Sequence, residues 1–240
     1  MIDLTKLNVK FFADGADIND IMLQLENPLV KGFTTNPTLM RKAGVKNYKS
    51  FALDLLDKIN QFPISFEVFA DDPRSIYSQA KEISSWGKNV NVKIPITTTK
   101  GENLFEVIKK LSIEGVQLNI TAILTLDQVV NTAKNLNKDV YSIISIFAGR
   151  IADTGVDPKK IMQDAKSSTL MLPQANILWA SPRQVLNILE AEDVGADIIT
   201  LTPELLNKAK SLGKNLEKLS LETVQMFYND AKQAGYKIEL

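Results

Sequence analysis

Hydrophobic and polar positions alternate with two different periods along the chain. Segments with apolar residues three and four positions apart are typical of amphipathic helices, whereas short runs that are apolar throughout or at every second position are typical of strands. Eight runs of the second kind follow one another: VKFFAD (9–14), GFTTN (32–36), PISFEVFA (63–70), NVNVKIP (89–95), GVQLNITAI (115–123), VYSIISIF (140–147), ANILWAS (175–181) and ADIITL (196–201).

Helical patterns fill the gaps between these runs. Apolar residues recur with helical spacing over 18–25, 48–59, 104–111 and 129–136. Thr125 and Gln128 form a capping box ahead of the last of these segments. Four prolines stand where a first helical turn is expected to begin, namely Pro73, Pro158, Pro182 and Pro203. A further helix is predicted to be capped by Ser220 and to run through Ala234, before Gly235 ends it.

Eight strand–helix units without a linker, a repeat or a low-complexity stretch predict one closed parallel barrel. The 240 residues are close to the roughly 250 that such a barrel needs. We therefore predict an α/β fold in which residues 1–240 form a single (β/α)8 barrel with an additional C-terminal helix. An open doubly wound sheet is the alternative, but no glycine-rich phosphate-binding turn follows the first strand.

A lysine interrupts the fourth strand-like run, and other strands carry similar interruptions. Side chains alternate between the two faces of a strand, so Asn91 and Lys93 share one face and Val90 and Val92 the other. Two more strands collect polar residues on one face: Ser65 with Glu67, and Gln117 with Asn119 and Thr121. Buried parallel strands are normally apolar on both faces, so the polar face of these strands needs an explanation.

In a barrel the apolar face meets the helices, and we expect the polar face to line the interior. Eight polar side chains would then meet near the C-terminal ends of seven strands: Asp14, Asn36, Glu67, Lys93, Asn119, Thr121, Ser145 and Ser181. Barrel enzymes place their chemistry at this rim. The alternatives are polar residues satisfied within an ordinary core, or an alternation displaced by one residue. A buried lysine without a partner is rare, which favours a site.

Composition excludes several classes of function. Lys plus Arg and Asp plus Glu both number 28, so the zero net charge gives no electrostatic reason to bind nucleic acid or an anionic membrane. The N-terminus shows no secretory signal, and no apolar run is long enough to span a bilayer. The chain contains no cysteine, which makes a reducing cytoplasm the simplest location.

The absence of histidine limits the catalytic mechanisms that the residues at this rim could use. It excludes histidine triads and His-ligated metal sites, and we expect neither a metal ion nor a cofactor. A neutral lysine can instead attack a ketone to form a Schiff base, whose iminium accepts electrons when a neighbouring C–C bond breaks. Burial of Lys93 would favour the neutral amine, whereas ionised Asp14 and Glu67 would oppose it, and the sequence leaves open which effect is larger. Either carboxylate could remove the proton from the departing carbon's hydroxyl.

Two arginines follow the sixth and seventh strand-like runs. Loops after the late strands of a barrel often bind phosphate, and a guanidinium group suits that task through paired hydrogen bonds. Arg150 and Arg183 lie close in sequence to Ser145 and Ser181, which favours phosphate binding over the alternative of surface salt bridges.

Seven motifs identify a resemblance to a known family. They occur in one order between residues 11 and 183: FFADGAD, GFTTNPTL, FEVFA, NVKIP, LNITAIL, ISIFAGRIAD and WASPRQ. With them the chain resembles the transaldolase family of class I, Schiff-base enzymes. The resemblance implies that Lys93 forms the Schiff base, that Asp14 shuttles the proton at the cleaved bond, and that Glu67 and Thr121 hold a catalytic water.

The same resemblance implies a set of residues that contact the substrate, its phosphate or the intermediate: Thr34, Asn36, Asn119, Ser145, Phe147, Arg150, Ser181 and Arg183. Two positions depart from the family pattern. Gly15 stands where relatives commonly carry threonine, and Pro182 where they carry a bulky apolar residue. Neither departure removes a charged group.

The reaction implied by the resemblance is transfer of a dihydroxyacetone unit from a ketose phosphate such as sedoheptulose 7-phosphate to glyceraldehyde 3-phosphate, which gives erythrose 4-phosphate and fructose 6-phosphate. The first alternative is a fructose 6-phosphate aldolase, but those relatives tend to carry glutamine in place of Glu67 and tyrosine in place of Phe147. The second alternative is a non-catalytic sugar-phosphate-binding barrel, which would be expected to lack Lys93, Asp14 or Glu67.

We also expect a homo-oligomer, because short relatives in this family tend to form ring-like assemblies. The last predicted helix carries an apolar stripe made of Leu221, Val224, Phe227, Tyr228 and Ala231. Such a stripe either closes the bottom of the barrel, which is the simpler reading, or packs on a neighbouring subunit.

Overall fold

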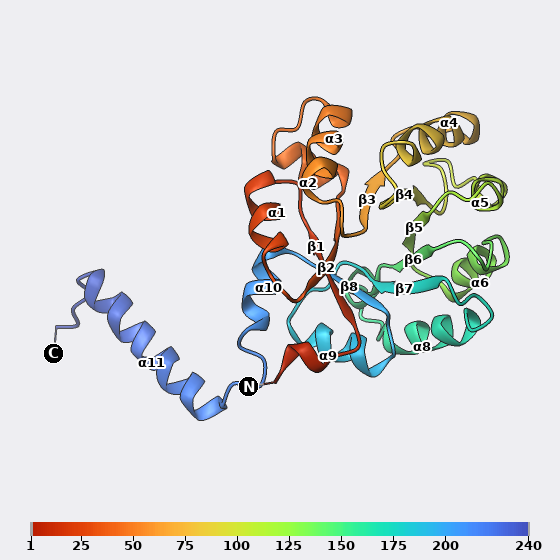
Figure 1. Ribbon diagram of the computed structural model, residues 1–240. Coiled ribbons are helices and arrows are strands. Elements are labelled where there is room, and N and C mark those ends of the chain that lie inside the picture. Colours follow the sequence, from red (N-terminus) through yellow and green to blue (C-terminus); the bar gives the residue numbers. More distant parts are fainter. Residues whose placement is uncertain (1, 240) are drawn as a thin grey trace.

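Eight parallel strands close into a barrel in the computed structural model, which describes residues 2–239 (Figure 1). The strands are β1 (Lys10–Asp14), β2 (Val30–Thr34), β3 (Ile64–Glu67), β4 (Val90–Pro95), β5 (Leu118–Ile123), β6 (Ser142–Ile146), β7 (Ala175–Trp179) and β8 (Ile198–Leu201). Each strand pairs with the next in sequence, and β8 pairs with β1. The predicted (β/α)8 barrel, a TIM barrel, is confirmed.

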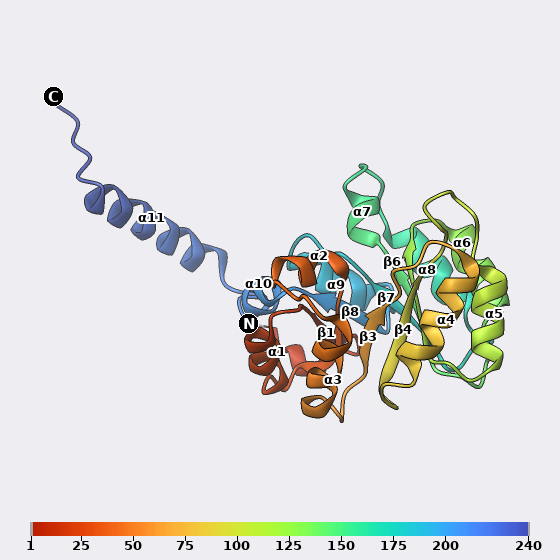
Figure 2. The same ribbon diagram turned by 90° about the horizontal axis from the view of Figure 1, so that it is seen from above.

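Helices surround the barrel, except the last one, which projects from it, as Figures 1 and 2 show from two directions. They are α1 (Ile18–Leu25), α2 (Pro37–Lys42), α3 (Tyr48–Lys58), α4 (Pro73–Ser84), α5 (Phe105–Ile113), α6 (Leu126–Lys134), α7 (Ala148–Ala152), α8 (Lys159–Ser168), α9 (Leu186–Asp193), α10 (Pro203–Ala209) and α11 (Leu216–Gln233), after a short 3-10 helix at Leu4–Lys6. No helix within residues 2–239 is long and apolar enough to cross a membrane.

Local sequence signals set several helix starts. The capping box of Thr125 and Gln128 is present at α6, and Pro73 and Pro203 open α4 and α10. Two predicted starts are wrong. Pro182 precedes α9, which begins only at Leu186, and Ser220 lies inside α11.

Asn215 explains why the last helix begins earlier than predicted. Its side chain accepts a hydrogen bond from the backbone N–H of Lys218, so it caps α11 one turn ahead of Ser220. Pro158 is the N-cap residue of α8 and so lies just outside the first turn.

The interior of the barrel contains both an apolar cluster and polar side chains. Phe12, Ile143, Leu178 and Ile198 come from four strands and form a cluster separate from the core between strands and helices. Alternation along the strands places this cluster inside the barrel. The polar interior is as expected on β3, β4 and β5. On β1, β6 and β8 an apolar inward side chain precedes a polar one: Phe12 precedes Asp14, Ile143 precedes Ser145 and Ile198 precedes Thr200.

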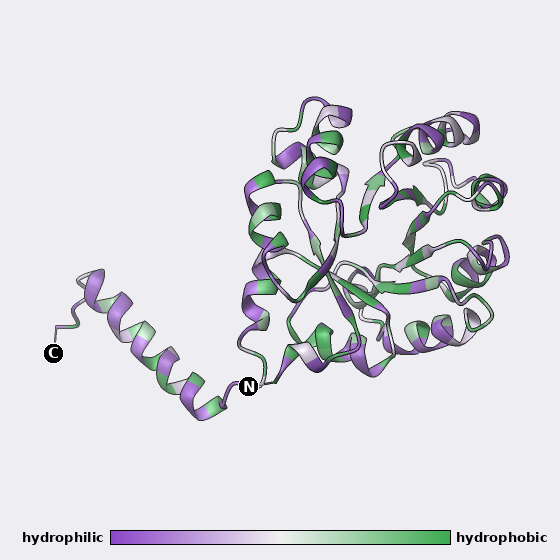
Figure 3. Ribbon diagram, in the orientation of Figure 1, coloured by the Kyte–Doolittle hydropathy of each residue, from purple (hydrophilic) through white to green (hydrophobic). Residues whose placement is uncertain are grey.

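Helix α11 projects away from the barrel in both views (Figures 1 and 2). None of its 18 residues is buried. The simpler reading, in which this helix closes the bottom of the barrel, is therefore wrong. Its apolar side chains remain available for another surface (Figure 3).

Candidate active site

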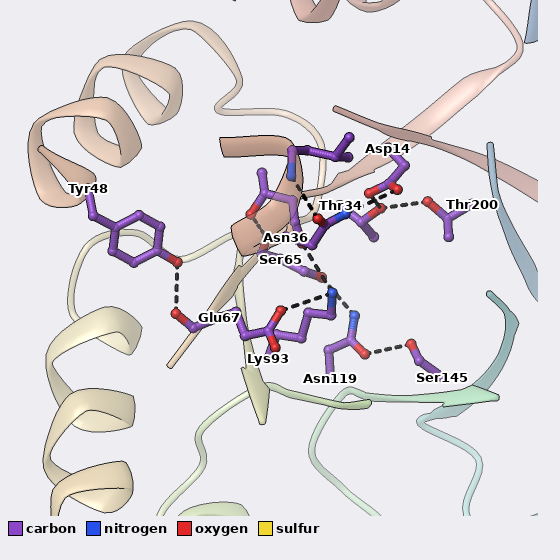
Figure 4. Close-up of polar contacts among 12 residues, drawn as sticks. Asp14, Thr34, Asn36, Tyr48, Ser65, Glu67, Lys93, Asn119, Ser145 and Thr200 are labelled. Atoms are coloured by element: carbon purple, nitrogen blue, oxygen red, sulfur yellow. Dashed lines mark hydrogen bonds and ion pairs between the residues drawn. The ribbon is translucent and has the colours of Figure 1, made fainter. Parts of the chain in front are cut away.

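Lys93 lies inside the barrel on β4, between apolar neighbours that face outward. The residue is 8% exposed. Its Nζ lies 3.2 Å from Oε2 of Glu67 and donates a hydrogen bond to the backbone oxygen of Thr35 at 3.1 Å (Figure 4). The amine therefore has a carboxylate and a carbonyl as partners, which compensates part of the cost of burying it.

Glu67 reaches the amine because of strand register. Parallel pairing sets Glu67 at the end of β3 opposite Lys93 on β4, with both side chains on the inner face. The hydroxyl of Tyr48 on α3 donates a hydrogen bond to the backbone oxygen of Glu67 at 2.9 Å and so stabilises this end of β3. A carboxylate 3.2 Å from an amine is close enough to exchange a proton with it.

Asp14 ends β1 and lies at the same rim. It accepts hydrogen bonds from Oγ1 of Thr34 at 2.8 Å and from Nδ2 of Asn36 at 3.4 Å. Burial raises the pKa of Asp14 above its usual value, and this effect exceeds the opposing attraction of Lys93. A carboxyl whose pKa is raised is suited to accept and return a proton.

Asn36 performs two tasks at the start of α2. Its Oδ1 accepts a hydrogen bond from the backbone N–H of Leu39 at 2.9 Å, which caps the helix and fixes the side chain. Its Nδ2 is left to face Asp14. Asn36 lies outside the strand predicted over 32–36, because β2 ends at Thr34.

A chain of hydrogen bonds between side chains of three strands crosses the interior near Lys93. Oγ of Ser145 on β6 donates to Oδ1 of Asn119 on β5 at 2.7 Å, and Nδ2 of Asn119 donates to Oγ of Ser65 on β3 at 3.0 Å (Figure 4). All three residues are buried. The chain fixes the amide of Asn119, whose strand neighbour in the register is Lys93.

Two further interior side chains have no protein partner among residues 2–239. They are Thr121, through its Oγ1, and Asn91, through both atoms of its amide. Buried polar atoms of this kind are commonly satisfied by ordered water. Thr121 lies two positions after Asn119 on β5 and follows the same alternation toward the interior.

The predicted phosphate ligands Arg150 and Arg183 lie on α7 and in the loop after β7. An added Cβ on Gly149 would lie 1.6 Å from the backbone oxygen of Ser181, so only glycine permits this approach of α7 to the loop after β7. Ser181 itself adopts a left-handed conformation with φ of 59°. The approach brings α7, which carries Arg150, next to the loop that carries Arg183.

Both arginines are exposed and already have partners. The guanidinium of Arg150 lies over the ring of Phe147, 5.4 Å from its centroid. Arg183 pairs with Asp153, and its Nε donates to Oδ1 at 3.1 Å. A phosphate bound by Arg183 would therefore have to share the guanidinium with Asp153 or displace it.

Seven of the predicted residues thus lie together at one end of the barrel: Asp14, Thr34, Asn36, Glu67, Lys93, Asn119 and Ser145. Helix α7 with Arg150 and the loop with Ser181 and Arg183 lie on one side of them. Ser65 and Thr200 belong to the same network but were not among the predicted residues. Ser65 shares the predicted polar face of β3, and this alternation could have indicated it. Thr200 sits in a strand that reads as apolar, where a threonine is ordinary.

The described residues contain no group of three or more acidic side chains that could hold a metal ion. The rim carries an amine, two carboxylates and several hydroxyl and amide groups. Groups of these types can form and break a Schiff base and transfer protons.

Comparison with known proteins assigns the chain to a family. The sequence model of the "Transaldolase/Fructose-6-phosphate aldolase" family matches residues 11–239. A "Probable transaldolase" of Nitrosopumilus maritimus is 33% identical over 234 residues, which cover 97% of this chain and all of that protein. Another "Probable transaldolase", from Dehalococcoides mccartyi, is 35% identical over 82% of this chain and 88% of its own length.

Solved structures with low sequence identity share the fold. Dihydrodipicolinate synthase from Rhodopseudomonas palustris superposes with a TM-score of 0.56 at 12% identity, over 96% of this chain and 81% of that one. A putative phosphonomutase from Burkholderia cenocepacia gives a TM-score of 0.58 at 9% identity, over 92% of this chain and 96% of the other. At this level of identity the likeness concerns the barrel architecture alone.

The contact of Gly149 with Ser181 leads to a stability prediction. We expect Gly149→Ala to lower the free energy of unfolding by about 1–3 kcal/mol or more, because a backbone oxygen occupies the position of the new methyl group. Gly15→Ala is the control, since its added Cβ would lie 4.0 Å from the nearest side-chain atom, and we expect a change within about 0.5 kcal/mol. Urea unfolding curves measure both, and equal stability of the two variants would contradict the described packing.

Proposed function

Because the chain belongs to the transaldolase/fructose-6-phosphate aldolase family, we propose that it is a transaldolase that works through a Schiff base on Lys93. It would transfer a dihydroxyacetone unit from sedoheptulose 7-phosphate to glyceraldehyde 3-phosphate, a reaction of the non-oxidative pentose phosphate pathway. The observation that carries the proposal is the buried amine of Lys93, 3.2 Å from Glu67 and at the same rim as Asp14. A cytoplasmic location stays a prediction from the sequence.

The first half of the reaction forms the covalent intermediate. Glu67, 3.2 Å from the amine, accepts a proton from the lysine ammonium, and the neutral nitrogen attacks the ketone carbon of the donor sugar. The same carboxyl, with a water held by Thr121, returns a proton to the hydroxyl of the carbinolamine, which leaves as water. Loss of water gives the iminium, which withdraws electrons from the neighbouring C–C bond.

The second half breaks that bond and makes a new one. Asp14 removes the proton from the hydroxyl on the departing carbon, the C–C bond breaks, and its electron pair moves toward the iminium nitrogen. The aldose leaves and a three-carbon enamine remains on Lys93. The acceptor aldehyde is then attacked by the enamine carbon, and Asp14 returns its proton to the new hydroxyl. Hydrolysis of the second iminium frees the lysine and releases fructose 6-phosphate.

The remaining rim residues are proposed to bind and orient the sugar. Asn36 and Asn119 present amide groups that are already fixed by a helix cap and by the bond with Ser145, so their hydrogen bonds cost little reorganisation. Arg150 and Arg183 are proposed to bind the phosphate from one side of the rim, together with Ser181. Thr34 and Phe147 would complete the pocket.

The close alternative is a lyase that releases free dihydroxyacetone. Release requires protonation of the three-carbon enamine, and a phenol near it could supply that proton, whereas the ring of Phe147 cannot. Phe147 and Glu67 therefore favour transfer over release. A non-catalytic sugar-phosphate-binding protein is the alternative of a different class. The presence of Lys93, Glu67 and Asp14 within one network argues against it.

A homo-oligomer is proposed on the basis of α11. Seven apolar side chains on this helix are between 43% and 78% exposed: Leu216, Leu219, Leu221, Val224, Met226, Phe227 and Tyr228. Most of the stability of a helix in a protein comes from packing of its amphipathic face, and α11 buries no residue within the described chain. We propose that a second copy of this chain covers it, so that each molecule both supplies a helix and receives one, in line with the resemblance to ring-forming relatives.

Borohydride trapping with fructose 6-phosphate tests the covalent step. We expect the wild-type protein to gain the mass of a reduced sugar adduct and Lys93→Met to gain none. Lys100→Met is the matched control, because Lys100 is exposed in the turn after β4 and its loss should leave the adduct intact. Asp14→Asn should still trap an adduct while its turnover falls by about 10²- to 10⁴-fold. Absence of an adduct in the wild-type protein would support the sugar-phosphate-binding alternative.

A product assay separates transfer from release. With fructose 6-phosphate and erythrose 4-phosphate together, we expect sedoheptulose 7-phosphate and glyceraldehyde 3-phosphate to form much faster than fructose 6-phosphate alone yields free dihydroxyacetone. The physical reason is that the rim has no phenol at Phe147 to protonate the enamine. Equal rates of the two processes would make the protein a lyase.

Light scattering on the full chain tests the oligomer. We expect the wild-type mass to be a multiple of the 26.7 kDa chain, and Val224→Asp with Phe227→Asp to lower it, because two charges would be buried against the second copy. Leu170→Asp is the control, since Leu170 is 74% exposed but lies on the barrel, after α8. A wild-type protein with the mass of one chain would contradict the proposed homo-oligomer.

A further inference from the structure

Thr200 contacts the proposed acid–base machinery from the far side of Thr34. It lies on β8 and is 8% exposed. Its Oγ1 is 2.5 Å from Oγ1 of Thr34, which in turn is 2.8 Å from Oδ1 of Asp14 (Figure 4). No step of the proposed mechanism uses Thr200, and the sequence motifs do not include it.

The direction of both hydrogen bonds follows from counting hydrogens. A threonine hydroxyl has one hydrogen to donate, and an ionised carboxylate can only accept. Thr34 must therefore donate its hydrogen to Asp14 when Asp14 is ionised. Its oxygen then has to accept from Thr200, which is the donor in the 2.5 Å contact. The chain runs from Thr200 to Thr34 to Asp14 and ends on the charge.

The chain can run the other way only when Asp14 carries a proton. Protonated Asp14 can donate to Thr34, which would then donate to Thr200. The two threonines thus respond to the protonation state of the carboxyl without moving. Because a hydrogen bond polarises the next one in a chain, the donor behind Thr34 strengthens the bond that reaches the carboxylate.

Asp14 needs such stabilisation because its surroundings oppose the ionised form. Burial is the largest influence and raises its pKa, and Glu67 on β3 raises it further. Lys93 on β4 lowers it, as do the hydrogen bonds from Thr34 on β2 and from Asn36 at the start of α2. With these influences opposed, one additional donor behind Thr34 shifts the balance between the two protonation states.

We propose that Thr200 is a positioning residue that directs the hydroxyl hydrogen of Thr34 onto Asp14 and so favours the ionised, proton-accepting carboxylate. Thr200 touches neither substrate nor the reacting atoms in this account. The proposal rests on Asp14 being the base of the proposed function. Its direct consequence, a change in the protonation equilibrium of Asp14, can be measured without any substrate.

The test compares Thr200→Val with Thr200→Ser. Valine keeps the shape of the side chain but removes the donor, so Thr34 loses the contact that orients it. We expect the pKa of Asp14 to rise by roughly half a unit in Thr200→Val and to return in Thr200→Ser. Carbon NMR of labelled aspartate carboxyls measures this, with Asp14→Asn to assign the signal. An unchanged or lower pKa in Thr200→Val would overturn the proposal.

The pH dependence of turnover gives a second readout. Fewer bonds to the ionised form raise the pKa, so the acid side of the rate profile should move to higher pH in Thr200→Val, with about a threefold loss of rate below the wild-type midpoint. Superposed profiles would contradict the proposal. Thr132→Val is the matched control, because Thr132 is a buried threonine on α6 whose hydroxyl has no protein partner within residues 2–239.

A replacement variant and a measurement without substrate allow the Thr200 proposal to be tested in every case. If Thr200→Val does not fold, Thr200→Ala removes the same donor and leaves space instead of a methyl group. If the wild-type protein traps no sugar, the proposed function fails, yet the NMR titration still decides whether Thr200 controls Asp14. The two failures can therefore be told apart.

Discussion

The pairing of Lys93 with Glu67 is the interaction on which the rest of the structure depends. An amine inside a barrel loses its hydration, and breaking a buried pair by removing one partner leaves an uncompensated charge. The carbonyl of Thr35 supplies a second acceptor at 3.1 Å. Polar residues on β3, β4 and β5 are arranged around this amine, and they explain why these strands alternate where buried parallel strands usually do not.

An apolar cluster inside the barrel provides the contrasting environment. Phe12, Leu178 and their apolar neighbours on β1, β6, β7 and β8 form this cluster. Asp14 lies next to it, since β1 supplies both Phe12 and Asp14 to the same face. Its carboxyl therefore experiences the burial that raises its pKa and also has the hydroxyl and amide donors of Thr34 and Asn36. Opposed influences of this kind are what an acid–base group needs.

The barrel and most of the rim could be predicted from the sequence because strand period and register are local properties. Alternation in NVNVKIP and PISFEVFA was enough to place Lys93 and Glu67 on one face, and pairing of adjacent strands set them side by side. Thr200 could not be predicted in this way. Its role depends on a contact with Thr34 that exists only because the barrel closes between β8 and β1.

The C-terminal helix α11 is a second feature that the sequence predicted only in part. Its apolar period correctly predicted a helix, but the cap is Asn215 and not Ser220. Both residue types can cap a helix, so the sequence alone does not decide between them. What covers an apolar face depends on tertiary or quaternary contacts, which periodicity does not contain. The most direct test of the central claim is the structure of the borohydride-trapped complex with fructose 6-phosphate. The account predicts a covalent bond from Nζ of Lys93 to the ketone-derived carbon of the trapped sugar fragment, with the carboxyl of Asp14 beside the carbon at which the C–C bond breaks. A sugar attached to another lysine, or held without a covalent bond while Lys93 stays paired with Glu67, would contradict it.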